Sequence, residues 1–188
     1  MPDRISLDTR ERLLAAAERL LLTRPYEEVS VRGVCTESGA NPAAVHYHFG
    51  SKDALVGALL EDRLGPLWAE RLGAVTARRV EVPAIVDAVI APFVDLAGDP
   101  IGRLHLRLLA GFVLGRHATT WRQPWFRMDS WVPLLPELSK SESRRRWQLA
   151  FDLIIARFGS AEQRALPEQA VESLKTFVIA GLTAPEQR

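Results

Sequence analysis

Two histidines and a single cysteine stand close together in the first third of the chain, and these residue types are the ones that ligate zinc. A shared site would require their side chains to converge. His46 and His48 are about 200° apart on a helix, so their side chains would diverge. Cys35, the only cysteine, excludes an intramolecular disulfide and fits a reducing compartment. We therefore expect neither a metal nor another cofactor in this stretch.

The elements expected around these residues are short helices with recognisable caps. Ser30 is a good cap for a helix over 31–37, which Ser38-Gly39 ends. Asn41-Pro42 opens a second helix to about His48, and Ser51 caps a third over 52–64. Two short helices joined by a tight turn, with a third packed behind them, predict a helix-turn-helix. Val45 would face inward, and Ala43, Ala44, Tyr47 and His48 would point outward.

The rest of the chain also shows helical periodicity, and no segment alternates in the way a strand would. Asp8 and Glu11 are spaced as a capping box for a helix over 8–22, which Pro25 ends. Gly65-Pro66 and residues 73–83 mark a boundary. Longer helices are expected over 84–97, 101–116, 142–158 and 167–182, with a kink at Pro92. The prediction is an all-α chain with domains at 8–64 and 65–188.

Composition limits the possible functions. The 188 residues are 47% hydrophobic and 25% charged, with a formal net charge of +1, which is typical of a folded globular chain. Residues 1–63 hold eight basic and ten acidic residues, a formal charge of −2, so a uniformly basic nucleic-acid coat is excluded. The longest apolar run, Leu108 to Leu114, is too short to span a bilayer, and because the amino terminus has no apolar core segment we expect it not to be a signal peptide. We expect a cytoplasmic protein with no membrane partner.

The run from Val29 to Leu55 resembles the amino-terminal domain of the TetR family of transcriptional regulators. The strongest pieces are Tyr47-His48-Phe49, Ser51-Lys52 and Ala54-Leu55, preceded by Ser38-Gly39 at the right distance. The resemblance covers about residues 8–64. The chain departs from the family at three positions: Pro25 replaces a common glycine, Gly33 replaces a better helix former, and His46 replaces the commonest residue, tyrosine.

The resemblance implies a double-stranded DNA operator as partner and assigns roles to residues of the motif. Contacts with DNA phosphates fall to Ser30, Tyr47, His48 and Lys52, and contacts with base edges to Arg32, Ala44 and His46. Alternatives remain open for several of them. Lys52 or Arg32 could be merely solvated, Ser30 could serve only as a cap, and Tyr47 with His48 could form a packed aromatic hinge.

Two helices near the carboxy terminus are apolar on more than one face, so each needs two partners. One partner is the body's own core, and the second could be the same helix pair of another subunit, as in TetR-like dimers. The expected interface residues are Trp147, Phe151, Phe158, Leu174, Phe177 and Gly181. A buried helix pair in a monomer is the alternative. A twofold dimer would fit a palindromic operator.

Four of the five tryptophans fall within residues 121–147, among several prolines. Aromatic side chains line most small-molecule pockets, although these rings could equally be core. The expected effector pocket comprises Phe93, His105, Phe112, His117, Trp121 and Trp125. An apolar or aromatic effector follows, with a carboxylate or hydroxyl met by His or Arg.

The sequence thus predicts a DNA-binding transcriptional regulator, a repressor released by its effector. The alternative is a helical ligand-binding protein or enzyme with an incidental helix-turn-helix. The chain has no Ser-His-Asp order, Gly-rich phosphate loop, His-Glu-x-x-His motif or paired-carboxylate site, so we expect it not to be an enzyme.

Overall fold

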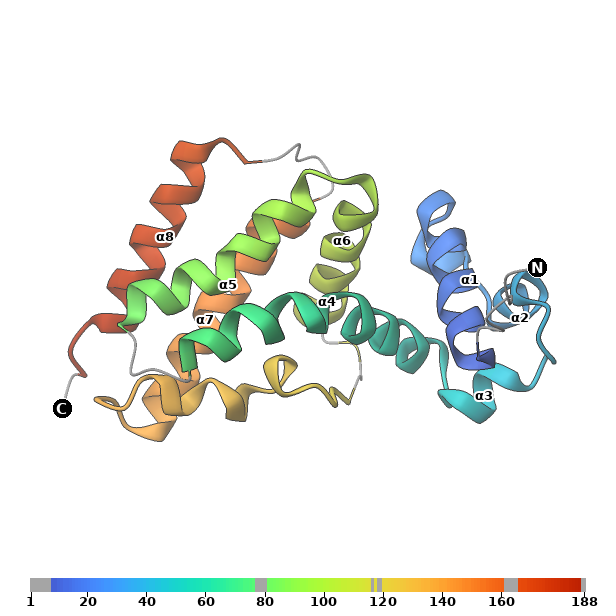
Figure 1. The fold of residues 1–188 in the computed structure, drawn as a ribbon, viewed down its shortest axis with the longest axis horizontal. Coiled ribbons are helices and arrows are strands. Elements are labelled where there is room, and N and C mark those ends of the chain that lie inside the picture. Colours follow the sequence, from blue (N-terminus) through green and yellow to red (C-terminus); the bar gives the residue numbers. More distant parts are fainter. Residues whose placement is uncertain (1–7, 77–80, 116, 118–119, 161–165, 187–188) are drawn as a thin grey trace, which may run out of the picture. The chain divides into compact units, whose positions relative to one another are not determined.

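The computed structural model describes residues 8–76, 81–115, 117, 120–160 and 166–186, and these residues form helices and loops without a strand. They divide into two compact units, one ending at Leu59 and the other starting at Leu60, with Thr120 grouped with the first. Figure 1 shows both units in sequence colours. In the described part of the chain, no helix has the length and apolar character that crossing a membrane requires.

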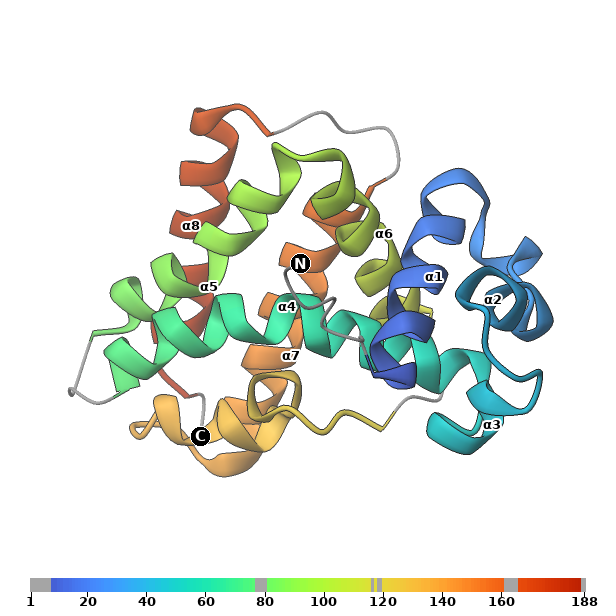
Figure 2. The same cartoon turned by 45° about the vertical axis from the view of Figure 1, so that its right-hand side comes forward.

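The amino-terminal unit contains α1 (Thr9–Thr23), the 3₁₀ turn η1 (Tyr26–Glu28), α2 (Val31–Ser38), α3 (Ala44–His48) and the first part of α4 (Lys52–Thr76). Both α1 and α2 contact α3, as Figures 1 and 2 show. The core of this unit is built from apolar side chains that are fully buried, among them Leu13, Leu14, Ala17, Val34, Val45 and Leu55. The expected helix-turn-helix is therefore present.

Local caps set the ends of these short helices. The Ser30 hydroxyl accepts the Gly33 N–H at 3.0 Å, and the Ser51 hydroxyl accepts the Ala54 N–H at 3.0 Å, which confirms both predicted caps. Gly39 ends α2 with φ of 64°, a left-handed conformation that favours glycine. The capping box predicted at the start of α1 is wrong, because the Asp8 side chain makes no cap hydrogen bond.

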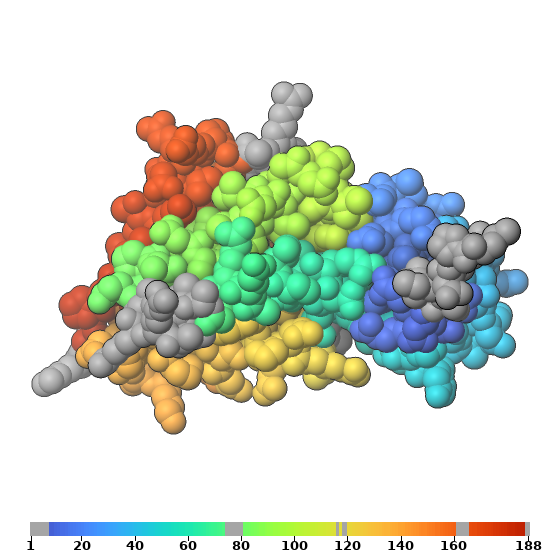
Figure 3. Space-filling model, viewed as in Figure 1, coloured from blue at the N-terminus to red at the C-terminus, as the bar shows by residue number. Residues whose placement is uncertain are grey.

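The carboxy-terminal unit contains the rest of α4, then α5 (Val82–Ala97), α6 (Pro100–Leu114), α7 (Lys140–Gly159) and α8 (Glu168–Thr183). Three 3₁₀ turns, η2 (Pro124–Phe126), η3 (Met128–Ser130) and η4 (Val132–Leu134), precede α7. Within the unit, α6 packs on α5 and α7, and α8 packs on the same two helices. The outer position of α8 is visible in the space-filling view (Figure 3).

The helix that begins at Lys52 does not end at Gly65-Pro66 as expected, because α4 runs on to Thr76 with Pro66 inside it. A proline in a helix interior removes one backbone hydrogen bond. Beyond it, α4 buries Trp68 and Leu72 against the unit, and such burial stabilises a helix more than local propensity does. The expected domain boundary at 64–65 thus falls inside α4.

Candidate nucleic-acid interface and candidate ligand cavity

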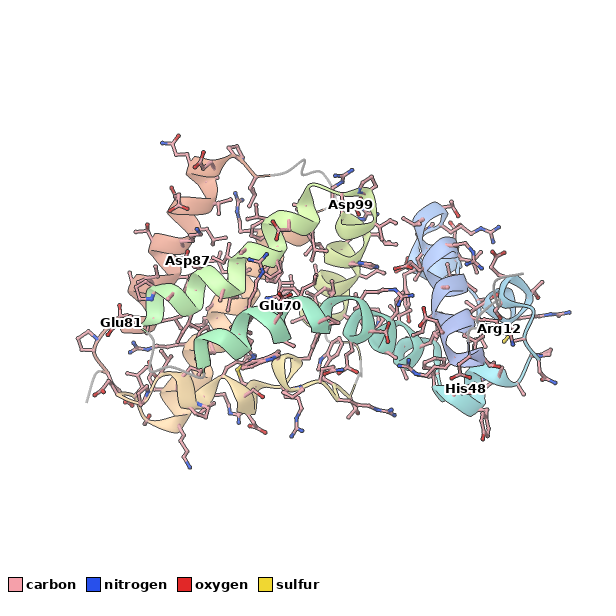
Figure 4. The ribbon with its side chains drawn as sticks, viewed as in Figure 1. Arg12, His48, Glu70, Glu81, Asp87 and Asp99 are labelled. Atoms are coloured by element: carbon pink, nitrogen blue, oxygen red, sulfur yellow. The ribbon has the colours of Figure 1, made fainter. Side chains whose placement is uncertain are left out.

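One surface of the amino-terminal unit is formed by the start of α2 and the outer side of α3. Ser30 and Arg32 are exposed at the start of α2, and His46 is exposed on α3. Tyr47 has 85% of its surface exposed, an unusual fraction for an aromatic side chain. His48 closes α3, as Figure 4 shows. The structure therefore brings most of the predicted DNA-contacting residues onto α2 and α3.

Ala44 is not on this surface. It is only 9% exposed and lies on the buried side of α3 beside Val45, so the expectation that it points outward is wrong. The error comes from the start of the helix. The Asn41 side chain accepts the Ala43 N–H at 2.9 Å, which holds residues 41–43 in a turn, and α3 begins only at Ala44. Ala43 is the exposed small residue instead.

The His46 ring is oriented by the backbone that follows α3. Its Nδ1 lies 3.0 Å from the Gly50 carbonyl oxygen, and because a carbonyl only accepts, Nδ1 carries the proton and donates. A neutral His46 therefore has Nε2 as an acceptor. The neighbouring rings pack locally: His48 lies edge-on to Tyr47 with centroids 5.0 Å apart and tilted toward Phe49 at 6.2 Å.

Lys52 fastens the loop before α2 to the start of α4. Its ammonium donates to the carbonyls of Tyr26 at 3.0 Å and Val29 at 3.1 Å, and Nζ lies 4.0 Å from the centroid of the Tyr26 ring. An ammonium has three N–H donors, so one remains for another acceptor. The alternative of a merely solvated lysine is wrong for this structure.

A second bond joins the same elements. The Tyr26 hydroxyl donates to the Asp53 carboxylate, and burial of the ring, followed by that hydrogen bond and the charge of Asp53, raises the pKa of Tyr26. The two residues are 27 positions apart. Neither residue belongs to a short-range sequence pattern that would connect it to the other.

The carboxy-terminal unit contains a partly open apolar cavity of about 140 Å³. Its walls come from α4 to α7 and from the segment 121–131. The lining consists of aromatic, aliphatic and thioether side chains: Trp68, Phe93, Leu109, Val113, Trp121, Trp125, Phe126, Met128, Trp131, Phe151 and Ile155. The predicted pocket residues Phe93, Trp121 and Trp125 are therefore brought together.

The other three predicted pocket residues do not line this cavity. His105 and Phe112 are buried at 5% and 3% exposure, and His117 stacks on Phe112 with centroids 4.7 Å apart. Helix α6 reaches the cavity with Leu109 and Val113, four residues apart on one face, whereas His105 and Phe112 share the neighbouring face. The composition around 121–147 signalled the aromatic wall but not the face of α6 that meets it.

A buried carboxylate holds one wall of the cavity. Glu61 of α4 is 8% exposed, and its Oε1 accepts the backbone N–H groups of Arg122 and of Gln123, the latter at 2.7 Å. One turn further along α4, Gly65 lies against the Gln123 side chain, where an added Cβ would be 3.5 Å from Cγ. This helix face thus anchors the start of the segment that carries Trp121 and Trp125. No motif in the sequence pointed to Glu61.

The predicted dimer residues divide into buried and exposed sets. Trp147, Phe158 and Leu174 are buried within the chain at 0%, 7% and 7% exposure, so their assignment to an interface between subunits is wrong. Phe151 lines the cavity instead. Phe177 is 69% exposed and Gly181 is also exposed. The two-sided apolar pattern could not tell which face the chain's own core would cover.

An apolar groove follows the exposed side of the pair α7–α8. It has a volume of about 240 Å³ and combines Phe177, Gly181 and six further residues: Arg146, Leu149, Ala150, Leu153, Val178 and Leu182. Leu149, like Phe177, is 69% exposed. In the described part of the chain, no three His, Cys, Asp or Glu side chains gather as a metal site needs.

Residues 13–59 match the family model of "Bacterial regulatory proteins, tetR family". The transcriptional regulator UidR of Escherichia coli K12 is 28% identical over 96 residues, which are 50% of this chain and 46% of UidR. The chain thus spans about half the length of the curated relatives it matches.

Solved structures share the fold over nearly the whole chain. NalD, a repressor of a multidrug efflux pump in Pseudomonas aeruginosa, has a TM-score of 0.61 at 18% identity over 92% of this chain and 96% of its own. AlkX, a TetR family repressor from Dietzia, has a TM-score of 0.58 at 16% identity over 94% and 96%. GusR of Salmonella enterica has a TM-score of 0.58 at 17% identity over 96% of this chain and 98% of its own. Residues 13–59, which contain the helix-turn-helix, are thus similar to the amino-terminal region of the TetR family of bacterial regulatory proteins.

Proposed function

We propose that this chain is a homodimeric transcriptional regulator, acting in the cytoplasm as a repressor, that binds a palindromic DNA operator and is released from it by a small apolar effector. The observation that carries the proposal is the exposed surface of α2 and α3, where Arg32, His46 and Tyr47 are free to meet DNA on a TetR-type helix-turn-helix. The repressors NalD and AlkX, which share the fold, support the direction of regulation.

The proposed roles on DNA follow from the side chains. Ser30, Tyr47, His48 and the remaining donor of Lys52 contact phosphates, which position the duplex without reading its sequence. Arg32 and His46 read base edges. Because the Gly50 carbonyl holds the Nδ1 proton of His46, the neutral ring offers an acceptor at Nε2. That acceptor suits the exocyclic amino group of adenine or cytosine in the major groove.

The test is selection of duplexes from a random library, followed by affinity measurements on single-base variants of the selected site. His46→Ala should lose about 1–3 kcal/mol on the selected site and lose preference at one base position. Tyr47→Ala should weaken binding to all sequences alike. If no duplex is enriched, the chain is a helical ligand-binding protein or an enzyme, and the proposal fails.

Two charge-matched variants separate base contacts from general charge loss. Arg32→Ala and Arg24→Ala each remove one positive charge, but Arg24 follows the end of α1, outside α2 and α3. Only Arg32→Ala should change base preference. Lys52→Ala should lower the slope of log affinity against log salt by about one unit. Its unfolding must be measured in parallel, because Lys52 also binds two carbonyls within the unit.

The second subunit is proposed to cover the groove along α7 and α8. Phe177 and Leu149 are exposed and line this apolar groove, and a twofold dimer interface uses the same patch of both subunits, so a second copy would bury both side chains. Phe177→Glu should dissociate the dimer in sedimentation experiments. The matched control is Ser173→Glu, which adds the same charge to an exposed position of α8 that does not line the groove. A wild-type monomer at micromolar concentration would contradict the proposal.

Release by an effector requires that the ligand and DNA favour different arrangements of the dimer, so that each weakens the binding of the other by the same factor. Segment 121–131 forms a wall of the cavity and is bound through Glu61 to α4, the helix that continues from the amino-terminal unit. A ligand that moves this wall would thereby act on α4. The measurement is operator affinity with and without ligand.

A further inference from the structure

The cavity in the carboxy-terminal unit has a wall without charge. None of its eleven lining residues has an acidic or basic side chain, and seven of them are tryptophan or phenylalanine. A carboxylate or ammonium group moved into such surroundings loses its hydration without gaining a partner, which is strongly unfavourable. The His and Arg contacts to an effector that the sequence suggested are absent from this lining.

Two of the four indole N–H groups in the wall are already used. Trp68 Nε1 donates to the Val89 carbonyl at 3.0 Å, and Trp131 Nε1 donates to the Trp125 carbonyl at 3.1 Å. These bonds fix the rings so that they present carbon surface to the cavity. The wall thus selects by shape and apolar contact more than by hydrogen bonding.

The size of the cavity limits what fits. Apolar engineered cavities of about 150 Å³ stay dry and bind benzene, and this cavity has a volume of about 140 Å³. Its rings meet at steep angles: Trp68 and Phe93 lie at 65° with centroids 5.1 Å apart, and Trp131 and Phe151 at 70° and 4.7 Å. Such edge-to-face walls complement a planar ring, because aromatic pairs favour offset and edge-on arrangements.

We propose that this cavity binds an uncharged molecule built on a single aromatic ring, of the size of benzene or toluene, and rejects the corresponding carboxylate. The proposal rests on the proposed function only in that this molecule would be the releasing effector. Binding to the cavity itself requires no DNA.

The experiment compares fluorobenzene with 4-fluorobenzoate by ¹⁹F NMR, since both carry the same reporter and differ by one carboxylate. Fluorobenzene should bind the wild-type protein saturably, and 4-fluorobenzoate at least tenfold more weakly. Val113→Phe fills the cavity from α6 and should abolish the fluorobenzene signal. The matched control is Val94→Phe on α5, because Val94 is 39% exposed and does not line the cavity.

Ile155→Phe fills the cavity from α7 and serves if Val113→Phe does not fold, as judged by circular dichroism. Equal affinity for the two compounds, or fluorobenzene binding that survives in a folded cavity-filled variant, would overturn the proposal. Duplex affinity measured on the same samples separates the two questions. Saturable fluorobenzene binding without an effect on the duplex supports the ligand class and contradicts release. Duplex binding without saturable fluorobenzene binding overturns the ligand class and leaves the DNA function standing.

Discussion

The amino-terminal and carboxy-terminal units differ in the sequence range of the interactions that stabilise each of them internally. In the amino-terminal unit, turns and helix starts are set by neighbours: Ser30 bonds the amide three residues later, and Gly39 ends its own helix. In the carboxy-terminal unit, the Glu61 carboxylate accepts amides 61 and 62 residues away. The exposed surface of α2 and α3 therefore depends on contacts between residues close in the sequence, whereas the cavity depends on contacts between residues far apart in the sequence. Substitutions in the two units should accordingly differ in how far their effects extend.

The largest expected effect is in the packed core of the carboxy-terminal unit. Trp147 is fully buried and its ring contacts Trp131 at 5.2 Å and Phe151 at 5.6 Å. Trp147→Ala should lower the free energy of unfolding by about 3–5 kcal/mol, because it removes a large side chain and leaves a cavity. Urea denaturation measures this change. The control is Gln148→Ala on the same helix, because Gln148 is exposed and does not line the α7–α8 groove, and it should change stability by at most about 0.5 kcal/mol.

The helices of this unit could be predicted from periodicity, but their faces could not. The expected ranges 84–97, 142–158 and 167–182 match α5, α7 and α8 to within two residues. Trp147 and Leu174 were nevertheless assigned to a subunit interface, although the chain's own core covers them. A helix that is apolar on two sides does not reveal which side meets which partner, because that depends on segments far away in the sequence.

A smaller effect is expected from the buried carboxylate that holds the wall of the cavity. Glu61→Ala would leave the Arg122 and Gln123 amides without their acceptor and should lower the free energy of unfolding by about 1–3 kcal/mol. Hydrogen exchange should report faster exchange at 122–123 with little change at 31–48. Glu61→Gln retains an acceptor oxygen and should lose less. Protection at 122–123 that is equal in Glu61→Ala and wild type would show that the bond contributes nothing.

Two glycines, one in each unit, differ in backbone conformation: Gly39 is left-handed and Gly73 is helical. Gly39 has φ of 64°, and a Cβ there would meet nothing within 4 Å, so Gly39→Ala tests backbone strain alone. It should destabilise the protein by about 1–2 kcal/mol. Gly73 lies inside α4, also with nothing within 4 Å of an added Cβ, and Gly73→Ala should stabilise by up to about 1 kcal/mol. Thermal unfolding gives both signs, and the same sign for both would contradict this account.

The parts of the candidate DNA-binding surface that depend on local turns and caps could be predicted from the sequence. Ser30, Gly39 and Ser51 have signatures within three residues, so the helix-turn-helix was predictable. Ala44 was placed on the wrong face because the Asn41 turn delays the start of α3. The bonds of Lys52 to Tyr26 and Val29 span more than twenty residues, and no local pattern signals them.

The smallest expected effect concerns the hydrogen bonds that join the end of α8 to the start of α7. Glu186, which follows α8, accepts the Ser139 backbone N–H at 2.9 Å and the Ser139 hydroxyl at 2.7 Å, just before α7 begins. The backbone bond, followed by the hydroxyl bond, lowers the pKa of the Glu186 carboxyl. The charged form is thus favoured in the folded state, and its contribution is complete above the pKa of an unfolded glutamate, about 4.3.

As the pH falls through this range, the unfolded state takes up its proton first, so stability decreases and the contribution is lost once Glu186 is protonated in the folded state. Glu142 titrates with the same sign because Arg146 and then Arg145 lower its pKa, so the pH dependence must be read as a difference between variants. Glu186→Gln should be less stable than wild type at pH 6, and the two should converge as the pH falls below the lowered pKa of Glu186 in the folded state. Carbon NMR titration should place the Glu186 pKa below its usual range in wild type. The Glu186 pKa should also stay below its usual range in Ser139→Ala, because this variant keeps the backbone donor. An ordinary Glu186 pKa in wild type would contradict these hydrogen bonds.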